Sequence, residues 1–298
     1  KAANPRRVNI RELFVTLPHE EKDYMVNPTG HWLGEFFLWI DRVLRQFERL
    51  IPVAVTGRAI GKALAFMKER LNGEDGLGAI FPAMANTVMA YHALGYPQTH
   101  PDYVTAREAM DKLLVFDGER GYCQPCLSPV WDTGLAAHAM LEAGFKAGDP
   151  VLDKASKWLV GRQILDVAGD WAEKEPGVRP GGWAFQYWND HYPDVDDTAV
   201  VVMALHKTDA EKYKIAIDRG IEWVIGMQSR NGGWGAFDVD NDHDVLQHIP
   251  FADHGALLDP PTADVSARCL GMLAQVGYTT AEPAVARAIE YLRREQEK

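Results

Sequence analysis

The stretch Arg219-Gly-Ile-Glu-Trp-Val-Ile-Gly-Met-Gln228, with Gly232-Gly-Trp234 shortly after it, decides the fold of this chain. An earlier copy covers 154–163 and is followed by Gly169-Asp-Trp171, and a later copy covers 287–296. The final glutamines of the copies recur at nearly equal intervals, which indicates an internal repeat. Each copy predicts a helix that ends in glutamine, a Gly-Trp turn in which the amide stacks on the indole, and a second helix. Such pairs close into a double ring, with the glutamine helices outside and the others around a cavity.

Helical spacing continues outside these copies. Apolar residues recur at intervals of three and four over much of the chain, and Gly, Pro and Asp residues separate the segments. We expect helices at 58–71, 83–94, 103–114, 133–147, 152–163, 198–207, 212–228, 263–276 and 283–296. No convincing alternating strand appears, so the predicted fold is all-α, an α/α toroid. The chain begins without Met and its last copy stops before a Gly-x-Trp turn. We therefore expect a piece of a longer protein, with a toroid incomplete at both ends.

The composition is that of a globular protein. The chain has 298 residues, 47% of them hydrophobic and 24% charged, with a formal net charge of -11. This charge argues against binding to a nucleic-acid backbone. No apolar run reaches the ~18 residues of a membrane span, and the N-terminus is not a signal peptide. Cys123 and Cys126 have the spacing of a redox pair or half a zinc site, but nothing completes such a site, so we expect two small side chains in a turn.

A cluster of carboxylates, Asp194-Val195-Asp196-Asp197-Thr198, lies directly before the apolar run 199–205. Carboxylates this close do not all ionise readily, so at least one should hold its proton above the usual pKa and be able to act as a Brønsted acid. The alternative is an ordinary helix start, with Asp194 as the N-cap and the other two in the first turn. The many aromatic residues within 183–192 favour the acid, because a solvated cap rarely needs them.

The carboxylate cluster, the Gln…Gly-x-Trp repeats and Ser128-Pro-Val-Trp131-Asp-Thr133 together resemble bacterial squalene–hopene cyclases, which are class II triterpene cyclases. Members of this family are longer and have two helical barrels. By resemblance, residues 1–125 match the later part of the first, membrane-side barrel, and residues 126–298 match the first part of the catalytic barrel. The implied reaction is the proton-initiated polycyclisation of squalene to hopene without a metal or redox cofactor.

The resemblance also implies roles for individual residues. Asp196 is the general acid, tuned by Asp194 and Asp197. Asp264 and Arg268 match the partner region of the acid, where many members have His in place of Arg268. Arginine stays charged and cannot shuttle a proton, so this chain would return the proton by another route, such as water. From the residues alone, an ion pair with Asp264 explains Arg268 equally well.

The expected substrate-binding residues follow from the same resemblance. Aromatic faces stabilise carbocations, and Trp131, Phe185 and Phe237 match cavity aromatics, although plain core packing is the alternative for each. Many members have Tyr at the position of Phe237. The other matched positions are Phe81, which is Gln in some members, Phe251 and Ala252 at the channel constriction, and His254, which is Phe in some members.

The expected partners are squalene and a membrane surface, with a homodimer left open and no nucleic acid. The apolar segment 31–55 either contributes to the membrane contact or forms a buried barrel helix. By resemblance, the protein lies monotopically on the cytoplasmic face of the bacterial inner membrane. The alternatives are an oxidosqualene cyclase, which typically has one Asp at this motif, a catalytically inactive fragment of a cyclase, and a helical-repeat scaffold. A scaffold predicts neither the carboxylate cluster nor the aromatics beside it.

Overall fold

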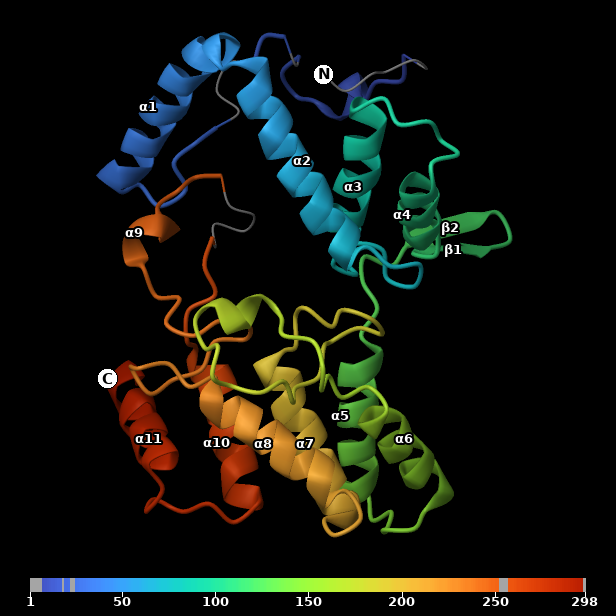
Figure 1. The fold of residues 1–298 in the computed structure, drawn as a ribbon, viewed down its shortest axis with the longest axis vertical. Helices are drawn as coiled ribbons and strands as arrows, with labels where there is room; N and C mark the ends of the chain where they lie inside the picture. Colours follow the sequence, from blue (N-terminus) through green and yellow to red (C-terminus); the bar gives the residue numbers. More distant parts are fainter. Residues whose placement is uncertain (1–6, 18, 22–24, 252–256, 297–298) are drawn as a thin grey trace.

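The chain forms two helical lobes, one above the other in Figure 1. The structure is a computed structural model that describes residues 7–17, 19–21, 25–251 and 257–296. Over these residues the fold is almost entirely helical, as the repeat predicts. No helix in the described ranges combines the length and the apolar character that crossing a membrane requires.

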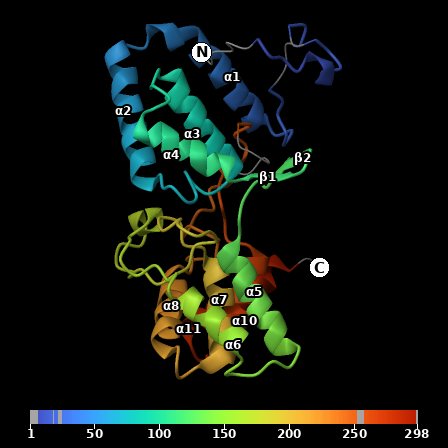
Figure 2. The same cartoon turned by 90° about the vertical axis from the view of Figure 1, so that its right-hand side faces the viewer.

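In its described residues, the first lobe holds four α-helices and a hairpin. The helices are α1 (Trp32–Phe47), α2 (Val53–Arg70), α3 (Phe81–Ala93) and α4 (Pro101–Asp111), with short 3-10 helices at Arg11–Leu13 and Glu48–Leu50. Antiparallel strands β1 (Leu114–Asp117) and β2 (Arg120–Cys123) follow α4 and project from the lobe (Figure 2). The expectation of no strand was therefore wrong. Gly118, with a φ of 60°, supplies the left-handed residue of the tight turn.

Across the part of the second lobe that the structure describes, the helices form three pairs. They are α5 (Pro129–Glu142) with α6 (Pro150–Val160), α7 (Val195–Asp209) with α8 (Lys214–Gly226), and α10 (Ala263–Gln275) with α11 (Pro283–Glu295). Helix α7 packs against both α5 and α10, and each of these three helices carries its own partner. Short helices lie in the loops, a 3-10 helix at Asp170–Glu173 and α9 at Asp244–Gln247. The central layer α5–α7–α10 and the layer α6–α8–α11 are the two layers that the repeat predicts.

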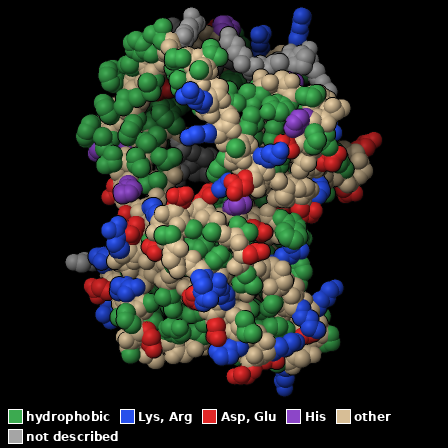
Figure 3. All heavy atoms as spheres, viewed as in Figure 1, with side chains coloured by type: hydrophobic (Ala, Val, Ile, Leu, Met, Phe, Trp, Pro, Cys, Tyr) green, Lys and Arg blue, Asp and Glu red, His purple; other side chains and the backbone are tan. Residues whose placement is uncertain are grey.

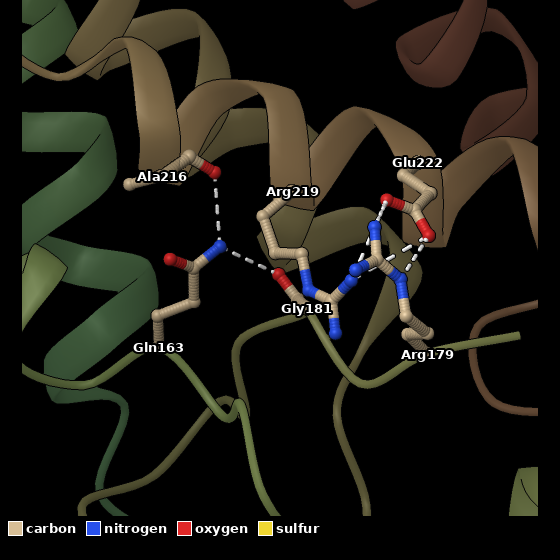
Figure 4. Close-up of polar contacts among 6 residues, drawn as sticks. All are labelled: Gln163, Arg179, Gly181, Ala216, Arg219 and Glu222. Carbon is tan, nitrogen blue, oxygen red and sulfur yellow. Dashed lines mark hydrogen bonds and ion pairs between the residues drawn. The ribbon is translucent and has the colours of Figure 1, made fainter.

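Two glutamines fasten neighbouring pairs together in the same way. The Gln163 amide donates to the carbonyls of Gly181 (2.8 Å) and Ala216 (2.9 Å) (Figure 4). The Gln228 amide donates to the carbonyls of Gly232 (2.8 Å) and Ala284 (2.9 Å). Each amide thus joins a glycine turn to the first turn of the next outer helix. Beside the first joint, Arg179 and Arg219 pair with Glu222 at the surface (Figure 4).

The sequence interpretation of these joints needs two corrections. The turn bonded to Gln163 is Gly181-Gly182-Trp183 and not Gly169-Asp-Trp171, because residues 164–180 are an insertion in this copy. The amide also bonds to backbone carbonyls, which explains the joint without stacking on an indole. Glycine is required where the turn meets the next helix. A Cβ on Gly181 would lie 2.4 Å from the Arg219 carbonyl oxygen, and a Cβ on Gly232 would lie 2.5 Å from that of Arg287.

The tryptophans of these turns lie in the hydrophobic core of the second lobe. The indole N–H of Trp183 donates to the Leu159 carbonyl (2.6 Å), and that of Trp234 donates to the Val224 carbonyl (2.7 Å). Their backbone N–H groups donate to the hydroxyls of Thr198 and Ser266, each at 2.9 Å. Both rings are fully buried. The repeat therefore places the start of α7 at the same point of its unit as the start of α10.

Candidate active site

The carboxylate cluster lies at the N-terminus of α7, in the middle of the central layer. The Asp194 carboxylate is the N-cap and accepts from the backbone N–H groups of Asp196 (2.7 Å) and Asp197 (3.2 Å). The Asp194 N–H donates to the Trp183 carbonyl (2.8 Å), and the Val195 N–H donates to the Ala236 carbonyl (2.8 Å). The capping interpretation is therefore right for Asp194. It leaves the other two side chains free for chemistry.

Two of the three carboxyls are buried. Asp194 is 8% exposed and Asp197 is 1% exposed. Burial raises the pKa of both well above the usual carboxyl range, and repulsion from neighbouring carboxylates adds to the rise, from Asp194 and Asp196 on Asp197 and from Asp196 and Asp259 on Asp194. The Asp197 Oδ1 atom has no hydrogen-bond partner among the residues that the structure describes. At neutral pH this pair therefore keeps a proton, which limits the negative charge of the cluster.

Asp196 turns toward α10 and meets Arg268 there. The Arg268 Nε atom lies 2.5 Å from the Asp196 Oδ1 atom, and the side chains are 34% and 20% exposed. Burial raises the pKa of Asp196, and the guanidinium opposes this shift. Arg268, which the resemblance matches to the partner region of the acid, thus pairs with Asp196 in the cluster, while Asp264, one turn earlier, lies exposed. The result is a partly exposed acid with a fixed cation beside its carboxylate.

Two aromatic rings continue the site away from the acid. The Arg268 Cζ atom lies 5.1 Å from the centroid of the Trp131 ring, and the Trp131 and Phe185 ring centroids are 6.4 Å apart. Both rings are half-buried. The Val130 N–H donates to the Phe185 carbonyl at 3.4 Å, which ties α5 to the loop before α7. The Asp196 carboxyl, the Arg268 guanidinium and the rings of Trp131 and Phe185 thus form one continuous series of contacts.

The remaining predicted site residues lie outside this series. The Phe237 ring is 37% exposed and lines a hollow of about 390 Å³ beside Tyr192 and Asp259, while its N–H donates to the Asp259 carboxylate (2.9 Å). Phe81 begins α3 in the first lobe, and Phe251 is exposed. No ring contact joins these three phenylalanines to Trp131 or Phe185 among the described residues. Two further predicted positions, Ala252 and His254, lie outside the residues that the structure describes.

Sequence reasoning gave no role to three residues that shape the site. The Thr198 hydroxyl donates to the Asp194 carbonyl (2.6 Å) and receives the Trp183 N–H, which locks the first turn of α7. Cys269 is fully buried on α10, where burial raises the pKa of its thiol. Asp259 holds the backbone of Phe237. The repeat carries a signal for Thr198, because Ser266 occupies the equivalent place in the next unit.

The CxxC motif lies apart from this site. Cys123 is exposed, Cys126 is half-buried, and neither is in a disulfide. Within the described part of the chain, no three or more His, Cys, Asp or Glu side chains are arranged to hold a metal ion.

Comparison with known proteins places these features in a family. Residues 127–298 match the family described as the squalene-hopene cyclase C-terminal domain, and residues 1–119 match the corresponding N-terminal domain. Proteins named squalene-hopene cyclase from Schizosaccharomyces japonicus and Zymomonas mobilis are 50% and 52% identical over 100% of this chain. A probable squalene–hopene cyclase from Sinorhizobium fredii is 54% identical over 99% of it. The chain spans about half the length of these relatives, 46–47%. With its α/α toroid architecture, the chain belongs to the squalene–hopene cyclase family.

Proposed function

We propose that this chain carries the proton-donating part of a cyclase that converts squalene to hopene, with Asp196 as the general acid. The observation that carries the proposal is the half-buried Asp196 carboxyl, which pairs with Arg268, neighbours two buried carboxyls in the same helix start, and is followed by aromatic faces. A terminal alkene is a very weak base, so its acid must be protonated and also strong. The arrangement supplies both properties, because burial favours the protonated form and the guanidinium stabilises the carboxylate left behind.

The reaction follows from these contacts. The Asp196 O–H bond breaks, its proton forms a C–H bond at the terminal alkene, and a tertiary carbocation results. Arg268 and the positive end of α7 stabilise the new carboxylate. The cation advances as successive double bonds attack it, and the faces of Trp131, Phe185 and Phe237 stabilise it without adding to it. Loss of a proton from carbon ends the cascade, and water that reaches the partly exposed Asp196 returns the proton there, since Arg268 cannot.

The two lobes correspond, in this proposal, to parts of two barrels. Residues 1–125 form the later part of the first, membrane-side barrel, and residues 126–298 form the first part of the catalytic barrel. The chain passes from one lobe to the other between β2 and α5 (Figure 1), and the two family matches meet in the same region. The channel constriction at Phe251 and Ala252 remains a prediction.

A membrane surface completes the proposal. Helix α1 and the segment after it expose a run of large apolar side chains, and hydrophobic atoms gather there in Figure 3. They are Trp32, Phe36, Trp39, Leu44, Phe47, Leu50, Ile51, Val53 and Val55, defined here as the α1 patch. An apolar patch of this size suits a monotopic contact through which an apolar substrate enters. The location on the cytoplasmic face of a bacterial inner membrane and a homodimer remain predictions, and the relatives include a fungal protein.

Product analysis tests the proposed reaction. Purified protein is incubated with squalene and, separately, with 2,3-oxidosqualene, and the products are identified by gas chromatography with mass spectrometry. Hopene from squalene is the expected result. Conversion of the epoxide alone would contradict the proposal in favour of an oxidosqualene cyclase, and conversion of neither substrate would favour an inactive chain.

A further inference from the structure

The turn after α2 in the first lobe holds the backbone of Trp188 in the second lobe. The Trp188 N–H donates to the Asp75 Oδ2 atom (2.6 Å), and the Asn72 side-chain amide donates to the Trp188 carbonyl (2.9 Å). The Asn72 Oδ1 atom also accepts from the Asp75 N–H (2.7 Å), so one turn presents both groups. Figure 1 shows this turn directly above the loop that precedes α7. Both the backbone N–H and the backbone carbonyl of Trp188 are thus bound from the opposite lobe.

A second contact reaches the same loop. The Arg70 Nη2 atom donates to the Asp170 Oδ1 atom (2.5 Å), and the Tyr192 hydroxyl donates to the Asp170 Oδ2 atom (2.7 Å). The Arg70 side chain is 10% exposed and its Cζ atom lies 3.6 Å from the Phe66 ring centroid. Burial, assisted by Asp170, raises the pKa of Tyr192 to about 12, so the phenol remains a donor. We define the interlobe clasp as these six residues: Arg70, Asn72, Asp75, Asp170, Trp188 and Tyr192.

The clasp holds two positions that lie between Phe185 and Asp194 in the sequence. Trp188 comes three residues after Phe185, and Tyr192 comes two residues before Asp194. Within the second lobe, the Phe185 backbone has a long bond of 3.4 Å to Val130. The bonds to the Trp188 backbone come from the first lobe, whereas the Tyr192 hydroxyl bonds to Asp170 within the second lobe, and Arg70 of the first lobe holds the other oxygen of that carboxylate. The segment that carries the aromatic wall and leads into the acid turn is therefore held from both lobes, because Arg162 of the second lobe also donates to the Tyr187 carbonyl (3.3 Å).

We infer that the interlobe clasp positions Phe185 and the acid turn, and that Asp75 is its principal positioning residue. Asp75 is only 5% exposed. A buried carboxylate is tolerated only while its hydrogen bonds are made, so Asp75 favours the one loop conformation in which the Trp188 N–H points at it. For the chemistry, the inference rests on the proposed function. Cation–π attraction depends on the distance to the ring, so a displaced Phe185 would end the cascade earlier.

Amide hydrogen exchange tests the positioning directly, without reference to activity. The Asp75→Ala variant is compared with the unsubstituted chain and with Glu74→Gln, which alters the neighbouring residue of the same turn and its contact with Lys112 (3.0 Å). We expect faster exchange at Trp188, which loses its acceptor. We also expect an increase of about tenfold at Asp194 and Val195, whose own acceptors are unchanged, and no increase in Glu74→Gln. Unchanged exchange at Asp194 and Val195 would overturn the inference.

Product analysis supplies the second readout. With squalene, Asp75→Ala should release a larger share of partly cyclised triterpenes, whereas Asp75→Asn, which keeps an acceptor oxygen, and Glu74→Gln should both resemble the unsubstituted protein. If amide exchange at Asp194 and Val195 rises in Asp75→Ala but the share of partly cyclised triterpenes stays the same, the link between the clasp and the choice of product is overturned. If the unsubstituted protein converts no squalene, the proposed function fails, and hydrogen exchange still decides the positioning. Tyr192→Phe, which removes one hydroxyl, replaces Asp75→Ala in both measurements if that variant does not fold.

Discussion

At the scale of single residues, the proposed function gives Arg268 the role of setting how strong an acid Asp196 is. Its guanidinium opposes the rise in pKa that burial causes, and it stabilises the carboxylate once the proton has left. We expect Arg268→Gln to lower turnover of squalene about tenfold or more, because one pKa unit is about 1.4 kcal/mol. The alkaline limb of the pH–rate profile should move to higher pH, since a weaker acid stays protonated longer. Arg268→Lys, which keeps the charge, is the matched control, and unchanged turnover in Arg268→Gln would contradict the role.

Asp197 should make the stability of the protein depend on pH. Burial raises its pKa in the folded state above the unfolded value. The folded state therefore binds more protons above pH about 4, and the free energy of unfolding falls as pH rises toward the folded pKa. We expect the melting temperature to fall between pH 5 and pH 7, and to fall less in Asp197→Asn. Asp117→Asn on the exposed hairpin is the control. An identical pH dependence in Asp197→Asn and the unsubstituted chain would show that the buried carboxyl is not protonated.

At the scale of elements, the glutamine joints hold one helix pair to the next. The Gln228 amide is 9% exposed and donates to carbonyls of two different segments. Removing it leaves these carbonyls without their donor, at a cost of about 1–3 kcal/mol. We therefore expect Gln228→Ala to lower the free energy of unfolding by that amount in urea titrations. The exposed Gln98→Ala should have almost no effect, and equal losses in both variants would indicate that the joint contributes nothing specific.

The elements also show what the sequence can and cannot predict. Apolar spacing predicted every helix of the second-lobe pairs with its ends within five residues, because apolar residues recur at helical intervals in all six. It missed β1 and β2, whose residues are mostly exposed and so show no alternation. It also assigned Gln163 to the wrong turn, because a Gly-x-Trp pattern occurs both in the insertion and after it.

The contact between Arg268 and Asp196 could be expected from two helix starts facing one another. The clasp could not, because its residues are far apart in the sequence.

At the scale of the whole molecule, the α1 patch is a run of large apolar side chains that are exposed to solvent. If it rests on a membrane, charges placed in it should prevent the contact. We expect Trp32→Glu combined with Trp39→Glu to reduce co-sedimentation with phospholipid vesicles at least severalfold. Ile215→Glu, at an 88% exposed position on α8, is the control. Equal sedimentation of all three proteins would argue that the patch packs against protein instead.

The central claim is that Asp196 delivers the proton that starts the cascade. Its most direct test is cyclisation of squalene in deuterium oxide by the unsubstituted protein and by Asp196→Asn, with the products analysed by mass spectrometry. The acid exchanges with solvent and the terminating step removes a hydrogen from carbon, so each hopene molecule should carry one deuterium. Asp196→Asn should form no hopene while retaining the helical circular dichroism and the melting temperature. Hopene formed equally well by Asp196→Asn, or hopene without deuterium, would contradict the account.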